Sequence, residues 1–154
     1  MDYPSNVLIT ADGAVSPGHA LQNSEDRLLA RGAYRELEIA GIQRTNLLLM
    51  GSAGAIRILL EMLRPKLREP ILTWRPGARL ELPSPGLVGT LVLHDVNELT
   101  PYDQDRLLAW LDPTAGETRV VSTTAGPLWR RVKAGAFNDV LYYRLNAVSA
   151  GVVV

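Results

Sequence analysis

The sequence predicts an α/β domain built on a mostly parallel sheet with helices on both faces. Two observations lead to this prediction. Short apolar runs of strand length alternate with segments of helical periodicity, and strands separated by helices pair in parallel. The chain of 154 residues is also 47% hydrophobic, which is enough for the core of one domain.

The first half of the chain predicts an arm, a helix, a strand and a second helix. Residues 1–23 are rich in turn formers and are expected to form an N-terminal arm, in which "NVLIT" could be a short strand. Ser24 is the expected N-cap of a helix that extends to about residue 40, because acidic residues follow it. The apolar run "NLLLM", residues 46–50, has the pattern of a buried parallel strand. A helix over about residues 55–64 follows and ends at Pro65.

The second half continues the alternation, so residues 24–154 are expected to form one α/β domain. Thr100 is the expected N-cap of a helix over residues 102–111, with Pro101 at the first helical position. The connection over residues 75–89 is rich in proline and glycine and is expected to contain a small hairpin around "ARLELP". The other expected elements are strands at 70–74, 89–96, 118–124 and 147–154 and short helices at 127–135 and 137–146.

Composition excludes several classes of function. The 16 basic and 16 acidic residues leave no net charge, so no nucleic-acid-binding surface is predicted. The absence of cysteine and the presence of only two histidines argue against a zinc site, and no metal site is expected. No apolar run reaches the ~20 residues needed to cross a bilayer. Since the N-terminus also lacks the features of a signal peptide, a cytoplasmic location is expected.

Two stretches in the last part of the chain carry a family resemblance. They are "GTLVLHDVNELTPYDQDRLLAWL", residues 89–111, and "AGAFNDVLYYRLNAV", residues 134–148, in which "DVLYYRLN" is a specific signal. They resemble the central AAA+ domain of bacterial enhancer-binding proteins, the sigma-54 interaction domain, which remodels sigma-54 RNA polymerase using ATP. The resemblance covers about residues 40–154 and implies a P-loop NTPase-like (AAA+) three-layer αβα sandwich. It further implies a five-stranded sheet of order 5-1-4-3-2, with nucleotide at the carboxyl ends of the strands.

The resemblance places a degenerate phosphate-binding loop after the strand at 46–50. A working loop presents backbone N–H groups and a lysine to the phosphates. Here Ile56 replaces the last glycine and its branched side chain resists positive φ, while Arg57 replaces the lysine with a wider head group. Two interpretations remain open: an ordinary strand-to-helix turn, or a weakened nucleotide site. The positions are Gly51, Ser52, Ala53, Gly54, Ala55, Ile56 and Arg57.

The other functional positions of the family are altered as well. His94 and Asp95 stand where the family has the Asp-Glu pair that orients magnesium and the attacking water. Histidine is a poor magnesium ligand, and Asp95 is one methylene shorter than the glutamate it replaces. The sensor position holds Ala125, which has no polar group. Of two arginines that reach a neighbouring subunit in the family, the first is replaced by Asn138 and the second is kept as Arg144, which is expected to pair structurally, for instance with an acidic residue.

Three segments of the family are also expected to be missing. Residues 75–89 are too short for the long insertion whose "GAFTGA"-like loop contacts sigma-54. No helical lid and no helix-turn-helix are expected after the last predicted strand.

These departures predict a degenerate AAA+ core, a pseudo-ATPase that acts as a regulatory or protein-interaction module in bacterial transcription control. Its expected partner is a response regulator or another activator, with no direct contact to nucleic acid or membrane, and it is expected to be a monomer or dimer. No cofactor is expected, although ATP with magnesium could bind at low affinity. The alternative is a divergent ATPase with weak hydrolysis linked to sigma-54-dependent transcription. A third interpretation is a remnant of a larger protein with no independent role.

Overall fold

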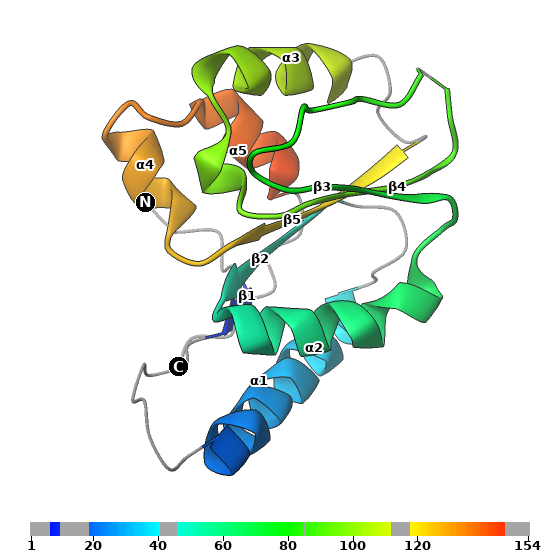
Figure 1. Cartoon of the computed structure of the whole chain (residues 1–154), viewed down its shortest axis with the longest axis vertical. Helices are drawn as coiled ribbons and strands as arrows, with labels where there is room; N and C mark the ends of the chain where they lie inside the picture. Colours follow the sequence, from blue (N-terminus) through cyan, green and yellow to red (C-terminus); the bar gives the residue numbers. More distant parts are fainter. Residues whose placement is uncertain (1–6, 10–18, 41–45, 85, 112–117, 147–154) are drawn as a thin grey trace.

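The protein is a three-layer sandwich of helices on both faces of a parallel five-stranded sheet (Figure 1). The computed structural model describes residues 7–9, 19–40, 46–84, 86–111 and 118–146. The strands are β1 (Val7–Ile9), β2 (Leu47–Gly51), β3 (Ile71–Trp74), β4 (Gly89–Leu93) and β5 (Thr118–Thr124). The helices are α1 (His19–Ala40), α2 (Ala53–Leu63), α3 (Pro101–Leu111), α4 (Leu128–Lys133) and α5 (Asp139–Leu145), with short 3₁₀ turns η1 (Arg64–Lys66) and η2 (Val96–Glu98).

The alternating side chains of the strands divide the core into two layers. In β2, Leu47 and Leu49 pack with α1 and α2 on one face of the sheet, whereas Leu48 packs with α3, α4 and α5 on the other. All five residues of β2 are buried, as are all residues of β4 and β5. A central parallel strand is covered on both faces, which explains the apolar runs of β2 and β4, whereas β5 also buries polar side chains such as Ser122 and Thr123.

The strand order is β1-β2-β5-β4-β3, and every pair is parallel. The four strands β2, β5, β4 and β3 follow the order expected from the family resemblance. The position beside β2, which that resemblance assigned to a strand at 147–154, is held by β1 instead, and residues 147–154 lie outside the described part of the chain. The expected N-terminal arm therefore contributes an edge strand to the sheet.

Several predicted boundaries were wrong. Helix α1 begins at His19 and not at Ser24, because residues 20–22 are good helix formers and continue the helix toward its N-terminus. Helix α2 begins at Ala53, two residues before the expected start. Strand β4 ends at Leu93 because Asp95 adopts a left-handed conformation, with φ of 50°, that turns the chain into η2. Aspartate tolerates this region better than most residues.

The expected hairpin within residues 75–89 is absent from the part of this connection that the structure describes. The segment instead turns at residues 75–78 and is held by side chains that donate to its carbonyl groups, and Leu80 on it is fully buried. These hydrogen bonds run from Trp74 Nε1 to Ala78 O (2.9 Å), from Arg106 Nη1 to Leu80 O (3.1 Å) and from Trp110 Nε1 to Pro83 O (2.8 Å). Packing against α3 thus replaces the local strand pairing that a hairpin needs.

Gln104 joins three segments on the α3 side of the sheet. Its side chain is buried in α3, and its Nε2 donates to Leu99 O at 3.0 Å and to Ala136 O at 3.1 Å. Its Oε1 accepts the N–H of Asn138 at 2.8 Å. One amide therefore connects the start of α3 with the loop that leads into α5.

Candidate functional site

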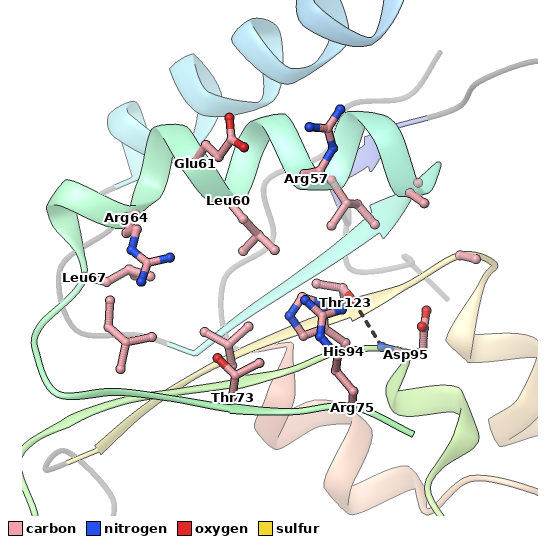
Figure 2. Close-up of a pocket in the computed structure, with 16 residues that line it drawn as sticks. Arg57, Leu60, Glu61, Arg64, Leu67, Thr73, Arg75, His94, Asp95 and Thr123 are labelled. Atoms are coloured by element: carbon pink, nitrogen blue, oxygen red, sulfur yellow. Dashed lines mark hydrogen bonds between the residues drawn. The ribbon is translucent and has the colours of Figure 1, made fainter. Parts of the chain in front are cut away.

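A cavity of about 460 Å³ lies between α2 and the sheet, toward the carboxyl ends of β3, β4 and β5 (Figure 2). Its volume is within the range of roughly 300–1,000 Å³ that is common for small-molecule sites. Ligands of open α/β sheets bind outside the carboxyl ends of the strands, which is where this cavity opens. It is lined by Gly51, Ala53, Ile56, Arg57, Leu60, Glu61, Arg64, Leu67, Ile71, Thr73, Arg75, Val92, His94, Asp95, Thr123 and Ala125.

Alternate side chains along each strand point to the same face of the sheet, and this alternation places the polar groups in the cavity. Along β3 and the residue after it, Ile71, Thr73 and Arg75 all line the cavity. The register pairs Trp74 with Leu93 and Leu93 with Ser122, so the next residues, Arg75, His94 and Thr123, lie in one row across three strands. The backbone bond from His94 N–H to Trp74 O, at 3.0 Å, continues the ladder to this row.

The turn from β2 into α2, where the resemblance placed a phosphate-binding loop, is an N-capped helix start. Ser52 is the N-cap, and its Oγ accepts the N–H of Ala55 at 3.3 Å. The N–H of Ile56 donates to Ser52 O at 3.0 Å as the first helical bond of the turn. Two N–H groups of the turn are therefore already bonded within it.

The buried carboxylate of Asp26 on α1 completes this turn. It is 5% exposed, and its Oδ1 accepts the hydroxyl proton of Ser52 at 3.3 Å. A Cβ on Gly54 would lie 2.3 Å from its Oδ2, so the absence of a side chain at Gly54 is what allows α1 and α2 to approach here. The resemblance gave no role to Asp26, which the sequence analysis used only as one of the acidic residues that follow Ser24.

Ile56 and Arg57 have different surroundings although they are neighbours in α2. The Ile56 side chain is 7% exposed and belongs to the apolar cluster between α1, α2 and the sheet. All four of Arg57, Leu60, Glu61 and Arg64 line the cavity, and Figure 2 shows the charged ends of Arg57 and Glu61 directed away from the strands, whereas Leu60 and Arg64 project toward them. This follows from the helical period, since residues four apart share a face.

His94 and Asp95 both line the cavity, but no hydrogen bond joins them in the described part of the chain. Burial lowers the pKa of His94, and the positive charge of Arg75 lowers it further, whereas Asp95 opposes both effects. The N–H of Asp95 donates to Thr123 Oγ1 at 3.1 Å, the bond drawn in Figure 2. This bond holds the left-handed turn after β4 against the end of β5.

The remaining candidate positions are divided between the two faces of the sheet. Ala125 lines the cavity, directly after Thr124, whose buried hydroxyl donates to Gly126 O at 2.9 Å. Asn138 lies on the opposite face, where its Oδ1 accepts the N–H of Leu141 at 2.9 Å and caps α5. Arg144 is exposed in the last turn of α5, and its backbone carbonyl accepts from Asn46 Nδ2 at 3.0 Å.

Sequence reasoning missed several groups that the fold brings to the cavity. Arg75, Thr123, Glu61 and Arg64 were given no role in the sequence analysis. The signal that could have found Arg75 is its spacing of two and four residues from Thr73 and Ile71 along β3. Within the described ranges there is no group of three or more His, Cys, Asp and Glu side chains suited to a metal ion.

The fold and site define a P-loop NTPase-like domain of the AAA+ class, as expected from the sequence. A family described as "Sigma-54 interaction domain" matches residues 76–152, which is half of the chain, and the chain belongs to that family. No curated protein sequence matched the chain. Among the described residues, no helix combines the length and apolar character that crossing a membrane requires.

Solved structures of NtrX from Brucella abortus share the fold. The structure in complex with ATP superposes with a TM-score of 0.60 at 20% identity, over 81% of this chain and 35% of that one. The structure in complex with ADP gives 0.52 at 18% identity, over 88% and 36%. A third NtrX structure gives 0.54 at 19% identity, over 91% and 37%. The chain thus spans about a third of the length of these proteins.

Proposed function

We propose that this sigma-54 interaction domain is a non-hydrolysing regulatory or protein-interaction module in bacterial transcription control. The observation that carries the proposal is the turn between β2 and α2. Helix α2 begins at Ala53, and the N–H groups of Ala55 and Ile56 are bonded to Ser52. A phosphate-binding loop needs such N–H groups to point at the phosphates.

Charge at this turn supports the same proposal. The carboxylate of Asp26 lies against Gly54, where it disfavours the approach of another anion. Arg57 replaces the lysine of the family, and although it lines the cavity its guanidinium group is directed away from the strands. At the end of β4, His94 offers a nitrogen ligand where magnesium prefers oxygen.

The short connection between β3 and β4 supports a role other than the usual contact with sigma-54. It is held against α3 by the hydrogen bonds to Ala78, Leu80 and Pro83. A segment of this length that is also fixed at these points cannot extend far from the sheet. We therefore propose a different protein partner, such as a response regulator or another activator, and a monomeric or dimeric state.

The alternative function is a divergent ATPase with weak hydrolysis. It is favoured by the fold shared with an NtrX structure in complex with ATP and by a cavity that includes Gly51, Arg57 and His94. A low-affinity site for ATP with magnesium would then lie at the carboxyl ends of the strands.

Isothermal titration with MgATP and a phosphate-release assay distinguish the two functions. The proposal expects no phosphate release above background, in the wild type and in an Arg57→Ala variant alike. Magnesium-dependent release that disappears in Arg57→Ala would instead establish the ATPase. Light scattering after size exclusion, with and without ATP, gives an independent result, because a hexamer or heptamer formed on adding ATP contradicts the proposal.

A further inference from the structure

The cavity beside α2 combines an apolar body with a polar end. Between helix and strands its walls are Leu60, Leu67, Ile71 and Val92. At the carboxyl ends of the strands its wall is the row formed by Arg75, His94 and Thr123, with Asp95 beside His94. Figure 2 shows the guanidinium group of Arg75 beside the His94 ring, and Arg64 at the other end of the cavity near Leu67.

The polar end carries hydrogen-bond donors that the fold itself does not use. The Arg75 side chain forms no hydrogen bond or ion pair with the residues that the structure describes, whereas Arg106 in α3 pairs with Asp103 at 3.1 Å. The Thr123 side chain is 2% exposed, and its oxygen accepts the N–H of Asp95. Its hydroxyl proton has no acceptor among the described residues and is available to a ligand.

The length of the apolar part limits the size of a ligand. Ile71 and Arg75 are four residues apart along one strand, which at about 3.3 Å per residue is a distance of roughly 13 Å. An unbranched chain of several carbons fits this distance, and an anionic group at its end would meet Arg75 and Thr123. A charged guanidinium and a hydroxyl donor both favour an anion over a neutral head group.

We propose that this cavity binds a small amphiphilic organic anion. Its carboxylate or phosphate head lies at Arg75, His94 and Thr123, and its apolar chain lies along Leu60, Leu67 and Ile71. The ligand is not a nucleotide, and this inference rests on the proposed function in one respect, namely that ATP does not fill the cavity.

Calorimetric titration of the whole chain with hexanoate, octanoate, octyl phosphate and octan-1-ol tests the proposal. Octanoate should bind roughly fifteenfold more tightly than hexanoate, because each buried methylene contributes about a fourfold gain in affinity. Octan-1-ol should bind at least tenfold more weakly than octanoate, since hydrogen bonds to charged groups are the stronger ones. Comparing octanoate with octyl phosphate identifies the preferred head group.

Two variants locate the site. Arg75→Gln should weaken octanoate binding about tenfold or more. Arg130→Gln, which removes the same charge from an exposed position on α4, should leave it unchanged. Circular dichroism confirms that both variants fold. In the wild type, octanoate should shift the NMR signal of the His94 ring, a measurement that needs no substitution.

The outcomes separate the inference from the proposed function. Equal binding of octanoate and octan-1-ol, equal effects of the two arginine variants, or no binding at all overturns the inference and leaves the proposed function standing. Octanoate binding that depends on Arg75 and is not displaced by MgATP, in a protein that nevertheless hydrolyses ATP, supports the anion site and overturns the proposed function. Displacement of octanoate by MgATP overturns both.

Discussion

Replacing Gly54 with alanine tests the contact between α1 and the start of α2. Alanine is favoured over glycine within helices by about 1 kcal/mol, so the substitution should stabilise α2 if only helix propensity mattered. The structure predicts the opposite result. The new Cβ would lie 2.3 Å from Asp26 Oδ2 and 3.3 Å from Asp26 Cγ, and real contacts are not that short.

The expected cost follows from the surroundings of Asp26. This side chain is short and only 5% exposed, so it cannot move aside while it keeps its hydrogen bond to Ser52. Losing a hydrogen bond to a charged group costs about 1.5–3 kcal/mol. After the helix propensity of alanine is subtracted, Gly54→Ala should lower the free energy of unfolding by about 0.5–2 kcal/mol.

Urea denaturation followed by circular dichroism measures this change, and an Asp26→Ala background supplies the comparison. There the clash is absent, so Gly54→Ala should stabilise the protein by up to about 1 kcal/mol. The two substitutions should therefore be coupled by about 1.5–3 kcal/mol, as residues in contact can be. Gly32→Ala on the exposed side of α1 is the control, because a Cβ there meets nothing within 4 Å and should stabilise. If Gly54→Ala is stabilising in both backgrounds, the account of this contact is wrong.

Three further predictions concern single side chains. Because burial and Arg75 lower the pKa of His94, the unfolded chain binds a proton more readily than the folded one. The stability that this difference gives is fully present above about pH 6.5 and should be lost as the pH falls toward the folded pKa of His94. Arg75→Gln should raise that pKa, which proton NMR can follow with only two histidines in the chain; an unchanged titration would exclude Arg75 as a cause. Gln104→Ala should lower the free energy of unfolding by about 2–4 kcal/mol, since three hydrogen bonds are lost, and a loss below 1 kcal/mol in urea denaturation would contradict this. Trp110→Phe leaves Pro83 O without its donor and should cost about 1 kcal/mol, whereas a stability equal to wild type would mean that water replaces the indole.

The central strands could be predicted from sequence because they are buried on both faces. Residues 118–124 were expected as a strand and form β5 with those bounds. A short run that is rich in β-branched residues and flanked by helices is typical of a buried strand. The helix after Thr100 was equally predictable, and Thr100 Oγ1 accepts the N–H of Asp103 at 3.1 Å as an N-cap. The start of α1 could not be predicted as well, because Ser24 within a run of good helix formers is compatible with a cap or with a helix interior.

The prediction of a hairpin within residues 75–89 was wrong because the pattern of a segment does not show which other segments supply its hydrogen-bond partners. "ARLELP" alternates as a strand does, but α3 provides Arg106 and Trp110 as partners for its carbonyl groups. These donors are more than twenty residues away in sequence. Such contacts depend on the packing of α3 on the sheet and leave no signal in the segment itself.

The sequence by itself determined the α/β class, the order of the strands β2, β5, β4 and β3 through the family resemblance, and membership of the sigma-54 interaction domain family. Periodicity carries this information because burial of alternate side chains is a local requirement of each strand and helix. Only the tertiary structure decided how Asp26 meets Gly54 and how Arg75, His94 and Thr123 form one row. Those groups come from elements far apart in the chain, and their approach depends on strand register and on how closely two helices pack.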